Sequence, residues 1–148
     1  MEAVTERKER RKVLVRSWEQ AETTFARLAR TPKHGGPARA IIGYATWLHQ
    51  RWPGQVGEGQ PNYAVKFHAT DVVTFYPDGR IRVATGGWLT KTTADRISDY
   101  TPEGITVRTK GVPRRGRAPV EFWVIDASEN EHDMTSTGYV TIAPNAGL

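Results

Sequence analysis

The sequence predicts an α+β fold, in which a mainly antiparallel β-sheet carries a long N-terminal helix and a short helix near residues 92–100. Three observations predict it. Apolar residues recur every three to four positions before residue 31, apolar and polar residues alternate in short runs after residue 40, and turn residues separate those runs. Strands that follow one another with few helices between them favour antiparallel pairing. Because 148 residues are enough for one core, we divide the chain into a basic amphipathic helix (1–31) and a single compact β-rich domain (40–148).

The first expected element is a helix over residues 5–30, with Thr5 as its N-cap and Pro32 ending it. One apolar stripe runs along this helix at steps of four and three residues: Leu14, Trp18, Ala21, Phe25 and Leu28. The stripe could cover the protein's own sheet, bind a partner or pair with a second copy of the chain. The candidate partner-binding residues are Leu14, Trp18, Phe25 and Leu28. Before the stripe lies a basic cluster that we expect to project into solvent: Arg7, Lys8, Arg10, Arg11 and Lys12.

Two extended segments follow. Residues 40–51 are rich in β-branched and aromatic side chains and are expected to form one strand, with a short helix as the alternative. Residues 53–62 contain three Gly and two Pro, which predicts a loop. Residues 63–75 alternate and are expected to remain extended, with a bend or bulge near Thr70 and Asp71. In this segment Lys66 should point away from the apolar face.

The second half of the chain begins with a turn at Pro77-Asp78-Gly79 and a return strand that directs Ile81 and Val83 inward. A helix is expected at about 92–100, because Thr92 and Asp95 have the spacing of a capping box. Strands are then expected at 105–109, 120–125 and 137–143, separated by a Gly/Pro/Arg-rich tip (110–119) and an acidic loop (126–133). The strand at 120–125 is apolar on both faces, which is typical of a central strand.

One block of the sequence resembles a recurrent segment in small proteins encoded by tailed bacteriophages and prophages. The block is HATDVVTFYPDGRIRVATGGWLTKTTADRI, residues 68–97. Its matching positions are His68, Thr70, Asp71, Asp78-Gly79, Gly86-Gly87-Trp88, Thr92-Thr93 and Arg96. The resemblance implies no particular activity. It implies an accessory protein of a phage that acts in the cytoplasm of the bacterial host.

Residues 86–92 invite comparison with a nucleotide phosphate loop, because they precede a predicted helix and end in Lys-Thr. Such a loop needs Gly immediately before Lys91, where this chain has Thr90. We therefore expect a turn at Gly86-Gly87 with Trp88 anchored in the core. Lys91 and the helix start remain candidates for contact with one phosphate of a polymer.

Enzymatic chemistry has little support in the sequence. The chain has no Cys, and its four His have no metal-ligand spacing. The best acid–base pair is His68 with Asp71, which could cooperate only across a bend. A structural hydrogen bond is favoured for that pair. We therefore expect no catalytic residue, no metal and no cofactor. No apolar run approaches the roughly 20 residues that span a bilayer, so no membrane role is expected.

The distribution of charge along the chain is the main basis for predicting a function. The formal net charge is +5, and residues 1–125 hold all 21 basic residues, whereas residues 126–148 carry only acidic ones. A cationic body attracts polyanions, of which nucleic acids are the most abundant in cells. Candidate nucleic-acid contacts lie on two strand faces, on the hairpin tip and at the helix start: Arg80, Arg82, Arg108, Lys110, Arg114, Arg115, Arg117 and Lys91.

The two strand faces would form one basic plate if they lay on the same side of a sheet, and Trp47, Trp52 or Tyr76 could then stack on unpaired bases. The sequence therefore predicts a phage accessory protein that binds DNA or RNA without sequence preference. The alternative is a non-enzymatic host-takeover or anti-defence protein that binds a bacterial protein through the N-terminal helix.

Overall fold

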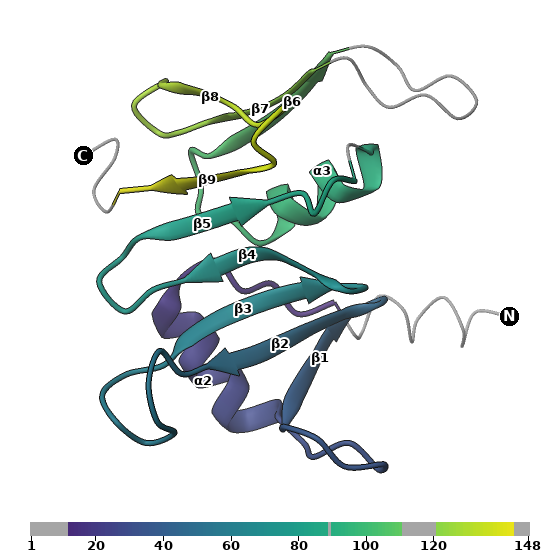
Figure 1. Cartoon of the computed structure of the whole chain (residues 1–148), viewed down its shortest axis with the longest axis vertical. Helices are drawn as coiled ribbons and strands as arrows, with labels where there is room; N and C mark the ends of the chain where they lie inside the picture. Colours follow the sequence, from purple (N-terminus) through teal and green to yellow (C-terminus); the bar gives the residue numbers. More distant parts are fainter. Residues whose placement is uncertain (1–11, 89, 111–120, 144–148) are drawn as a thin grey trace, which may run out of the picture.

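The computed structural model describes residues 12–88, 90–110 and 121–143, and they form two antiparallel sheets and two helices (Figure 1). The larger sheet has the order β1 (Arg39–Gly43), β2 (Thr46–Arg51), β3 (Asn62–Phe67), β4 (Thr70–Phe75), β5 (Ile81–Ala84) and β9 (Tyr139–Ile142). The smaller sheet has the order β6 (Thr106–Lys110), β7 (Glu121–Ile125) and β8 (Glu131–Asp133). The expected α+β, mainly antiparallel fold is confirmed.

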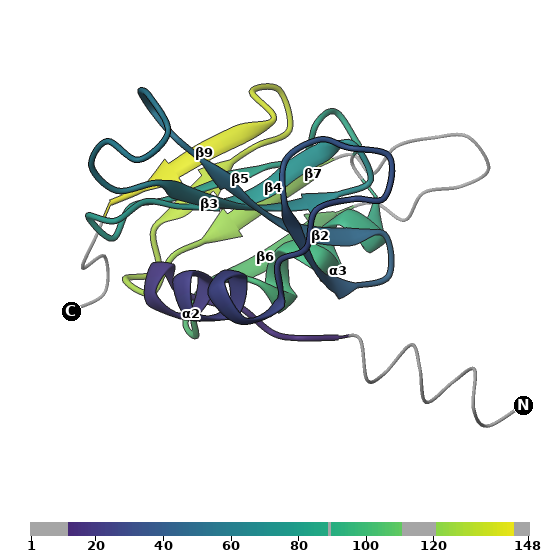
Figure 2. The same ribbon diagram turned by 90° about the horizontal axis from the view of Figure 1, so that it is seen from below.

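The core lies on one side of the six-stranded sheet. Helices α2 (Trp18–Leu28) and α3 (Lys91–Asp99) both lie on this side, as Figure 2 shows. Helix α2 contacts β1, β2 and β3, whereas α3 contacts β4 and β6. One hydrophobic cluster joins residues of α2, both sheets and α3; it includes Ala21, Leu48, Val65, Val83, Ile97, Phe122 and Met134. Within the described residues, the other side of the large sheet carries no helix.

The N-terminal helix is shorter than expected. It begins at Trp18 and not at Thr5, because Ser17 is its N-cap: the Ser17 hydroxyl accepts a hydrogen bond from the Gln20 amide. Residues 12–16 are not helical. Val13 donates its amide to the Ile42 carbonyl at 2.7 Å, and Val15 is fully buried. The expected N-cap Thr5 and most of the basic cluster lie outside the described residues.

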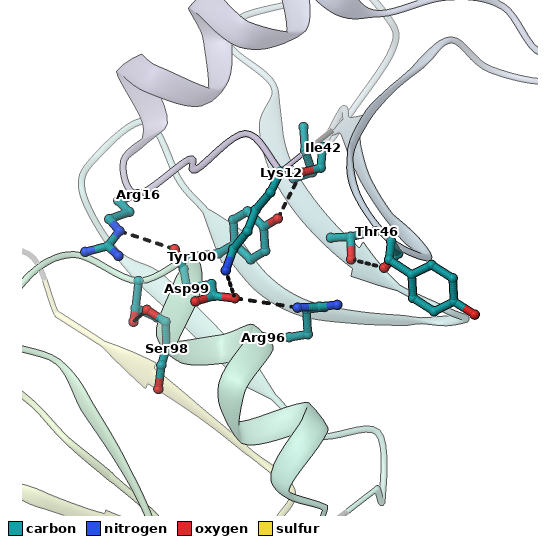
Figure 3. Close-up of polar contacts among 10 residues, drawn as sticks. Lys12, Arg16, Ile42, Thr46, Arg96, Ser98, Asp99 and Tyr100 are labelled. Carbon is teal, nitrogen blue, oxygen red and sulfur yellow. Dashed lines mark hydrogen bonds and ion pairs between the residues drawn. The ribbon is translucent and has the colours of Figure 1, made fainter. Parts of the chain in front are cut away.

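Polar contacts hold the segment before α2 against the end of α3 (Figure 3). Lys12 Nζ lies 3.2 Å from Asp99 Oδ2, and Arg16 Nε donates to the Asp99 carbonyl at 3.2 Å. The Tyr100 hydroxyl donates to the Ile42 carbonyl at 3.1 Å. Burial raises the pKa of Tyr100 to about 12, so this hydroxyl remains a donor. These contacts connect α3 to β1 and explain why residues 12–16 leave the helical path.

Two expected strands are each a hairpin. Residues 40–51 form β1 and β2, which turn at Tyr44-Ala45, with Ala45 at φ +48°. Residues 63–75 form β3 and β4, which turn at His68-Ala69, with His68 at φ +54°. A register irregularity follows Val65, so the expected bulge lies in the strand pairing near, but not at, Asp71. Non-glycine residues at positive φ left no recognisable turn signal in the sequence.

The remaining elements lie close to their expected positions. Ile81 and Val83 are buried, as expected for the return strand. Helix α3 starts two residues early relative to the expected cap, because the Thr90 hydroxyl accepts from the Thr93 amide. The strand β7 is the central strand of the smaller sheet. The acidic segment is not entirely a loop, since Glu131–Asp133 forms β8. Residues 111–120, which include most of the basic tip, lie outside the described part of the chain.

Candidate nucleic-acid interface

The strand register separates two faces of the six-stranded sheet. Residues opposite each other on neighbouring strands share a face, and successive residues alternate. Leu48 pairs with Val65 on the core side, so the neighbouring pairs Arg39–His49 and Trp47–Lys66 lie on the other side. We call this other side the outer face. Its charged and aromatic members are Arg39, Trp47, His49, Arg51, Lys66, Asp71, Arg82 and Tyr139.

The outer face has an excess of positive charge. Its strands contribute Arg39, Arg51, Lys66 and Arg82, against the single carboxylate of Asp71. Arg51 of β2 reaches across β3 to Asp71 of β4, with 3.1 Å between Nη2 and Oδ1. Within the described residues, the other three cations have no carboxylate partner. Their charge is available to a polyanion.

Aromatic rings lie under the arginines at both ends of the outer face. The Arg39 guanidinium lies 4.9 Å from the centre of the Trp47 ring, and that of Arg82 lies 4.7 Å from the Tyr139 ring. Tyr139 is 53% exposed. A guanidinium held flat against a ring keeps its N–H groups directed outward and leaves a planar surface for stacking.

His49 is the buried member of the outer face. The residue is only 8% exposed, and its Nε2 atom has no hydrogen-bond partner in the described structure. Burial lowers the pKa of His49, and the neighbouring charges of Arg51, Lys66 and Arg39 lower it further, against an opposing effect of Asp71. His49 is therefore neutral at physiological pH in a strongly cationic setting.

The predicted nucleic-acid contacts that the structure describes do not gather in one place. Arg82 lies on the outer face. Arg80 lies in the turn before β5, where its Nε is 2.7 Å from Asp78 Oδ2. Arg108 and Lys110 lie on β6 in the other sheet, 3.7 Å from Glu131 and Glu121 respectively. The two strand faces lie in different sheets, so the condition under which they would form a single basic plate is not met.

The other predicted nucleic-acid contacts lie away from the outer face or outside the described residues. Lys91 opens α3, on the side of the large sheet opposite the outer face. Arg114, Arg115 and Arg117 lie outside the described residues. Of the expected stacking residues, Trp47 lies on the outer face, Tyr76 stacks with Arg80 at 4.5 Å, and the Trp52 indole donates to Gln50.

Sequence reasoning missed Arg39, His49 and Arg51 as parts of the site. A signal was present, because Trp47, His49 and Arg51 alternate with Leu48 and Gln50. This signal was not used, because residues 40–51 were interpreted as one strand. With no second strand paired to it, the face shared by Arg39 and His49 could not be recognised. Lys66 was correctly expected to point away from the apolar face but was not assigned to a site.

The candidate partner-binding stripe is mostly used inside the molecule. Trp18, Phe25 and Leu28 pack against the core cluster. The Trp18 indole donates to the Pro61 carbonyl at 2.9 Å, and its ring contacts that of Tyr63. Leu14 is not on α2 and is 46% exposed. The helix thus covers its own sheet, which was one of the alternatives considered from the sequence.

Residues 68–97 contribute most of the lining of a cavity. About 480 Å³ lies between the His68-Ala69 turn, Trp88 and the start of α3. Trp88 is 66% exposed, so the expectation that it anchors α3 in the core is wrong. His68 is not bonded to Asp71, whose carboxylate pairs with Arg51 instead. Neither the structural hydrogen bond that was favoured for His68 and Asp71 nor the acid–base pair is therefore formed.

The described residues contain no group of three or more side chains suited to holding a metal ion. In the same residues, no helix combines the length and the apolar character that crossing a membrane requires. No family model, curated protein or solved structure matches the chain. The resemblance of residues 68–97 to phage proteins therefore stays a prediction.

Proposed function

We propose that this protein binds single-stranded nucleic acid on the outer face of its six-stranded sheet, without sequence preference. We further propose that it does so as an accessory protein of a bacteriophage, in the cytoplasm of the bacterial host. The origin and location rest on the resemblance of residues 68–97. The binding activity rests on the geometry of the outer face.

One observation carries the binding proposal. A sheet face that no described helix covers holds four cationic side chains, one carboxylate and two aromatic rings that lie under arginines. Cations attract the phosphate backbone whatever its sequence, because each contact releases a condensed counterion. The exposed Tyr139 ring and the guanidinium planes that lie over Trp47 and Tyr139 offer surfaces for stacking on unpaired bases, and every base has a face suited to stacking. The two kinds of group together favour a single strand over a duplex, whose bases are already stacked.

The chain offers a charge-matched test of this proposal. The double variant Lys66→Gln/Arg82→Gln removes two cations from the outer face, whereas Arg108→Gln/Lys110→Gln removes two from the smaller sheet. Binding of a fluorescent oligo(dT) should weaken about tenfold or more in the first variant and change little in the second. Fluorescence anisotropy over a series of salt concentrations would measure both the affinity and its salt dependence.

The salt series also separates the mechanisms. The slope of log K against log salt should become shallower by roughly one to two in the outer-face variant, because two phosphate contacts are lost. Equal losses in both variants would mean that only the net charge matters. An unchanged affinity in the outer-face variant would rule out this face.

The alternative proposal, docking to a bacterial host protein through the N-terminal helix, has less support. Three of its four residues, Trp18, Phe25 and Leu28, pack against the chain's own core. Leu14 is the exposed one of the four. Replacing Leu14 with Ser should abolish capture of a host protein if that alternative holds, and should leave oligo(dT) binding unchanged.

A further inference from the structure

A second feature lies at the edge of the outer face, beside β1, which is the edge strand of the large sheet (Figure 1). A cavity of about 500 Å³ opens there. The loop between α2 and β1 forms one wall, from Pro32 to Pro37, and Arg39 and His49 form the other. The cavity is therefore continuous with the outer face through two of its own residues.

The buried imidazole in this wall lacks a partner. His49 is more than nine-tenths buried, yet its Nε2 atom makes no hydrogen bond within the described structure. Buried polar atoms in folded proteins are nearly always bonded, and an unpaired one is destabilising. His49 is also one of the residues that line the cavity, so an anion bound there would lie beside this imidazole.

The charges around the cavity define what that group is. Lys33, His34, Arg39 and His49 line it, and Arg51 and Lys66 lie near enough to act on the charge of His49. Asp71 is the one carboxylate that acts on His49, and it is paired with Arg51. Neither Lys33 nor Arg39 has a carboxylate partner within the described residues. The cavity is thus suited to an anion that carries more than one negative charge.

We propose that this cavity binds the terminal phosphate group of a nucleic-acid strand that lies on the outer face. This inference rests on the proposed function and specifies one end of the bound strand. An internal phosphodiester carries a single charge, whereas a terminal phosphomonoester carries about −1.5 to −2 near neutral pH and has three acceptor oxygens. Arg39 donates to such oxygens in a fixed fork geometry, and Lys33 contributes a point charge. The edge of the sheet is where a strand crossing the face would end.

Binding of the dianion has a consequence at His49 itself. Burial and the nearby cations lower the pKa of His49, and an added double negative charge opposes the effect of those cations. The pKa of His49 should therefore rise when the terminal phosphate is bound.

The test compares three oligo(dT) strands of equal length, with a 5′-phosphate, a 3′-phosphate or hydroxyl groups at both ends. One phosphorylated strand should bind about tenfold more tightly than the hydroxyl strand. Arg39→Gln should abolish this preference. The matched control is Arg82→Gln: it also removes one outer-face arginine that lies over an aromatic ring, but at a distance from the cavity. That variant should bind all strands more weakly and keep the preference.

An independent readout is the NMR titration of the His49 ring with each strand and with inorganic phosphate. The preferred strand should raise the pKa of His49, and the hydroxyl strand should not. Equal affinity for all three strands would overturn this inference and leave the proposed function intact. Failure of every strand to bind would overturn both. A His49 response to inorganic phosphate, together with equal affinity for the strands, would assign the cavity to a small phosphate compound and would also overturn the inference.

Discussion

Gly86 lies at a close approach between two turns within residues 68–97. Its φ is +63°, and a Cβ atom there would meet the Thr70 side chain, with Cγ2 at 2.6 Å and the hydroxyl oxygen closer still. Gly87 also has a positive φ, +85°, but its Cβ would meet nothing within 4 Å. Substitution at Gly86 would therefore introduce both steric overlap and backbone strain, whereas substitution at Gly87 would introduce backbone strain alone.

Replacing Gly86 with Ala should destabilise the protein by about 2–4 kcal/mol, because overpacking adds to the cost of a positive φ. Replacing Gly87 with Ala should cost only about 1 kcal/mol, since it carries the backbone strain alone. Urea denaturation of both variants would measure the difference. Adding Thr70→Ala to the Gly86 variant should recover part of the loss, and no recovery would contradict the steric explanation.

The ionised carboxylate of Asp126 is expected to stabilise the fold, and this contribution should be lost at acid pH. Its Oδ2 lies 3.0 Å from His132 Nε2, and its Oδ1 accepts the amides of Ser128 and Asn130. The bond to His132 is the largest cause that holds the pKa of Asp126 below its ordinary value of 3.8; the two amides lower it further and burial opposes them. A carboxyl whose pKa is depressed by folding stabilises the protein above its unfolded pKa and loses that contribution as pH falls through its folded pKa.

Asp126→Asn should therefore reduce the free energy of unfolding at pH 7, and the difference from the parent protein should shrink below about pH 4. Urea denaturation at pH 7 and pH 3 would measure this. Asp133→Asn is a useful comparison, because the pKa of Asp133 is also depressed, but by the hydroxyl and amide of Thr135 on an exposed residue. A loss at pH 3 as large as that at pH 7 would contradict the assigned role of ionised Asp126.

At the scale of single elements, the start of α2 decides how the N-terminal segment is used. Ser17 caps the helix, so the apolar stripe begins at Trp18 and the preceding residues run beside β1. A helix continued to residue 12 would withdraw Val15 from the core and Val13 from its bond to Ile42. Tertiary contacts of these two residues outweigh the helical periodicity of the segment.

Replacing Ser17 with Ala should cost about 1 kcal/mol of stability, because the Gln20 amide loses its acceptor. Ser17→Asp should retain most of the stability, since a carboxylate also accepts this bond and favours the positive end of the helix. Thr23→Ala on the exposed side of α2 serves as the control. Chemical denaturation would rank the three variants, and an Ala variant as stable as the parent would contradict the cap at Ser17.

At the scale of the whole molecule, the two sheets share one core. Phe122, Val124 and Met134 of the smaller-sheet region belong to the same hydrophobic cluster as Leu48 and Val65 of the larger sheet. The chain also passes from β8 directly to β9, which pairs with β5. Neither sheet can lose its structure without exposing apolar surface of the other.

The described part of the chain should therefore unfold in a single transition. Backbone amide resonances of β3 and β7 should lose native intensity at the same urea concentration. A separate, earlier transition of β7 would contradict the shared core. It would not affect the binding proposal, because the outer face belongs to the large sheet alone.

The same scale explains how a basic surface arises from residues far apart in the sequence. Arg39, Lys66 and Arg82 come from three strands that are brought to one face by register. Arg108 and Lys110 have the same local pattern but lie on another sheet, next to Glu131 and Glu121. Local alternation predicts that a side chain points away from the core, but it does not predict which residues lie next to that side chain.

The sequence by itself determined the fold class, most of the strands after residue 60 and the inward positions Ile81, Val83, Ala94 and Ile97. These features follow from alternation, helical spacing and turn residues, which act over a few positions along the chain. It did not determine the hairpins at Ala45 and His68, because positive φ at such residues has no reliable sequence signal. The tertiary structure alone decided the start of α2, the division into two sheets and the members of the outer face. Each of these depends on contacts between residues distant in sequence, whose energies local patterns do not contain.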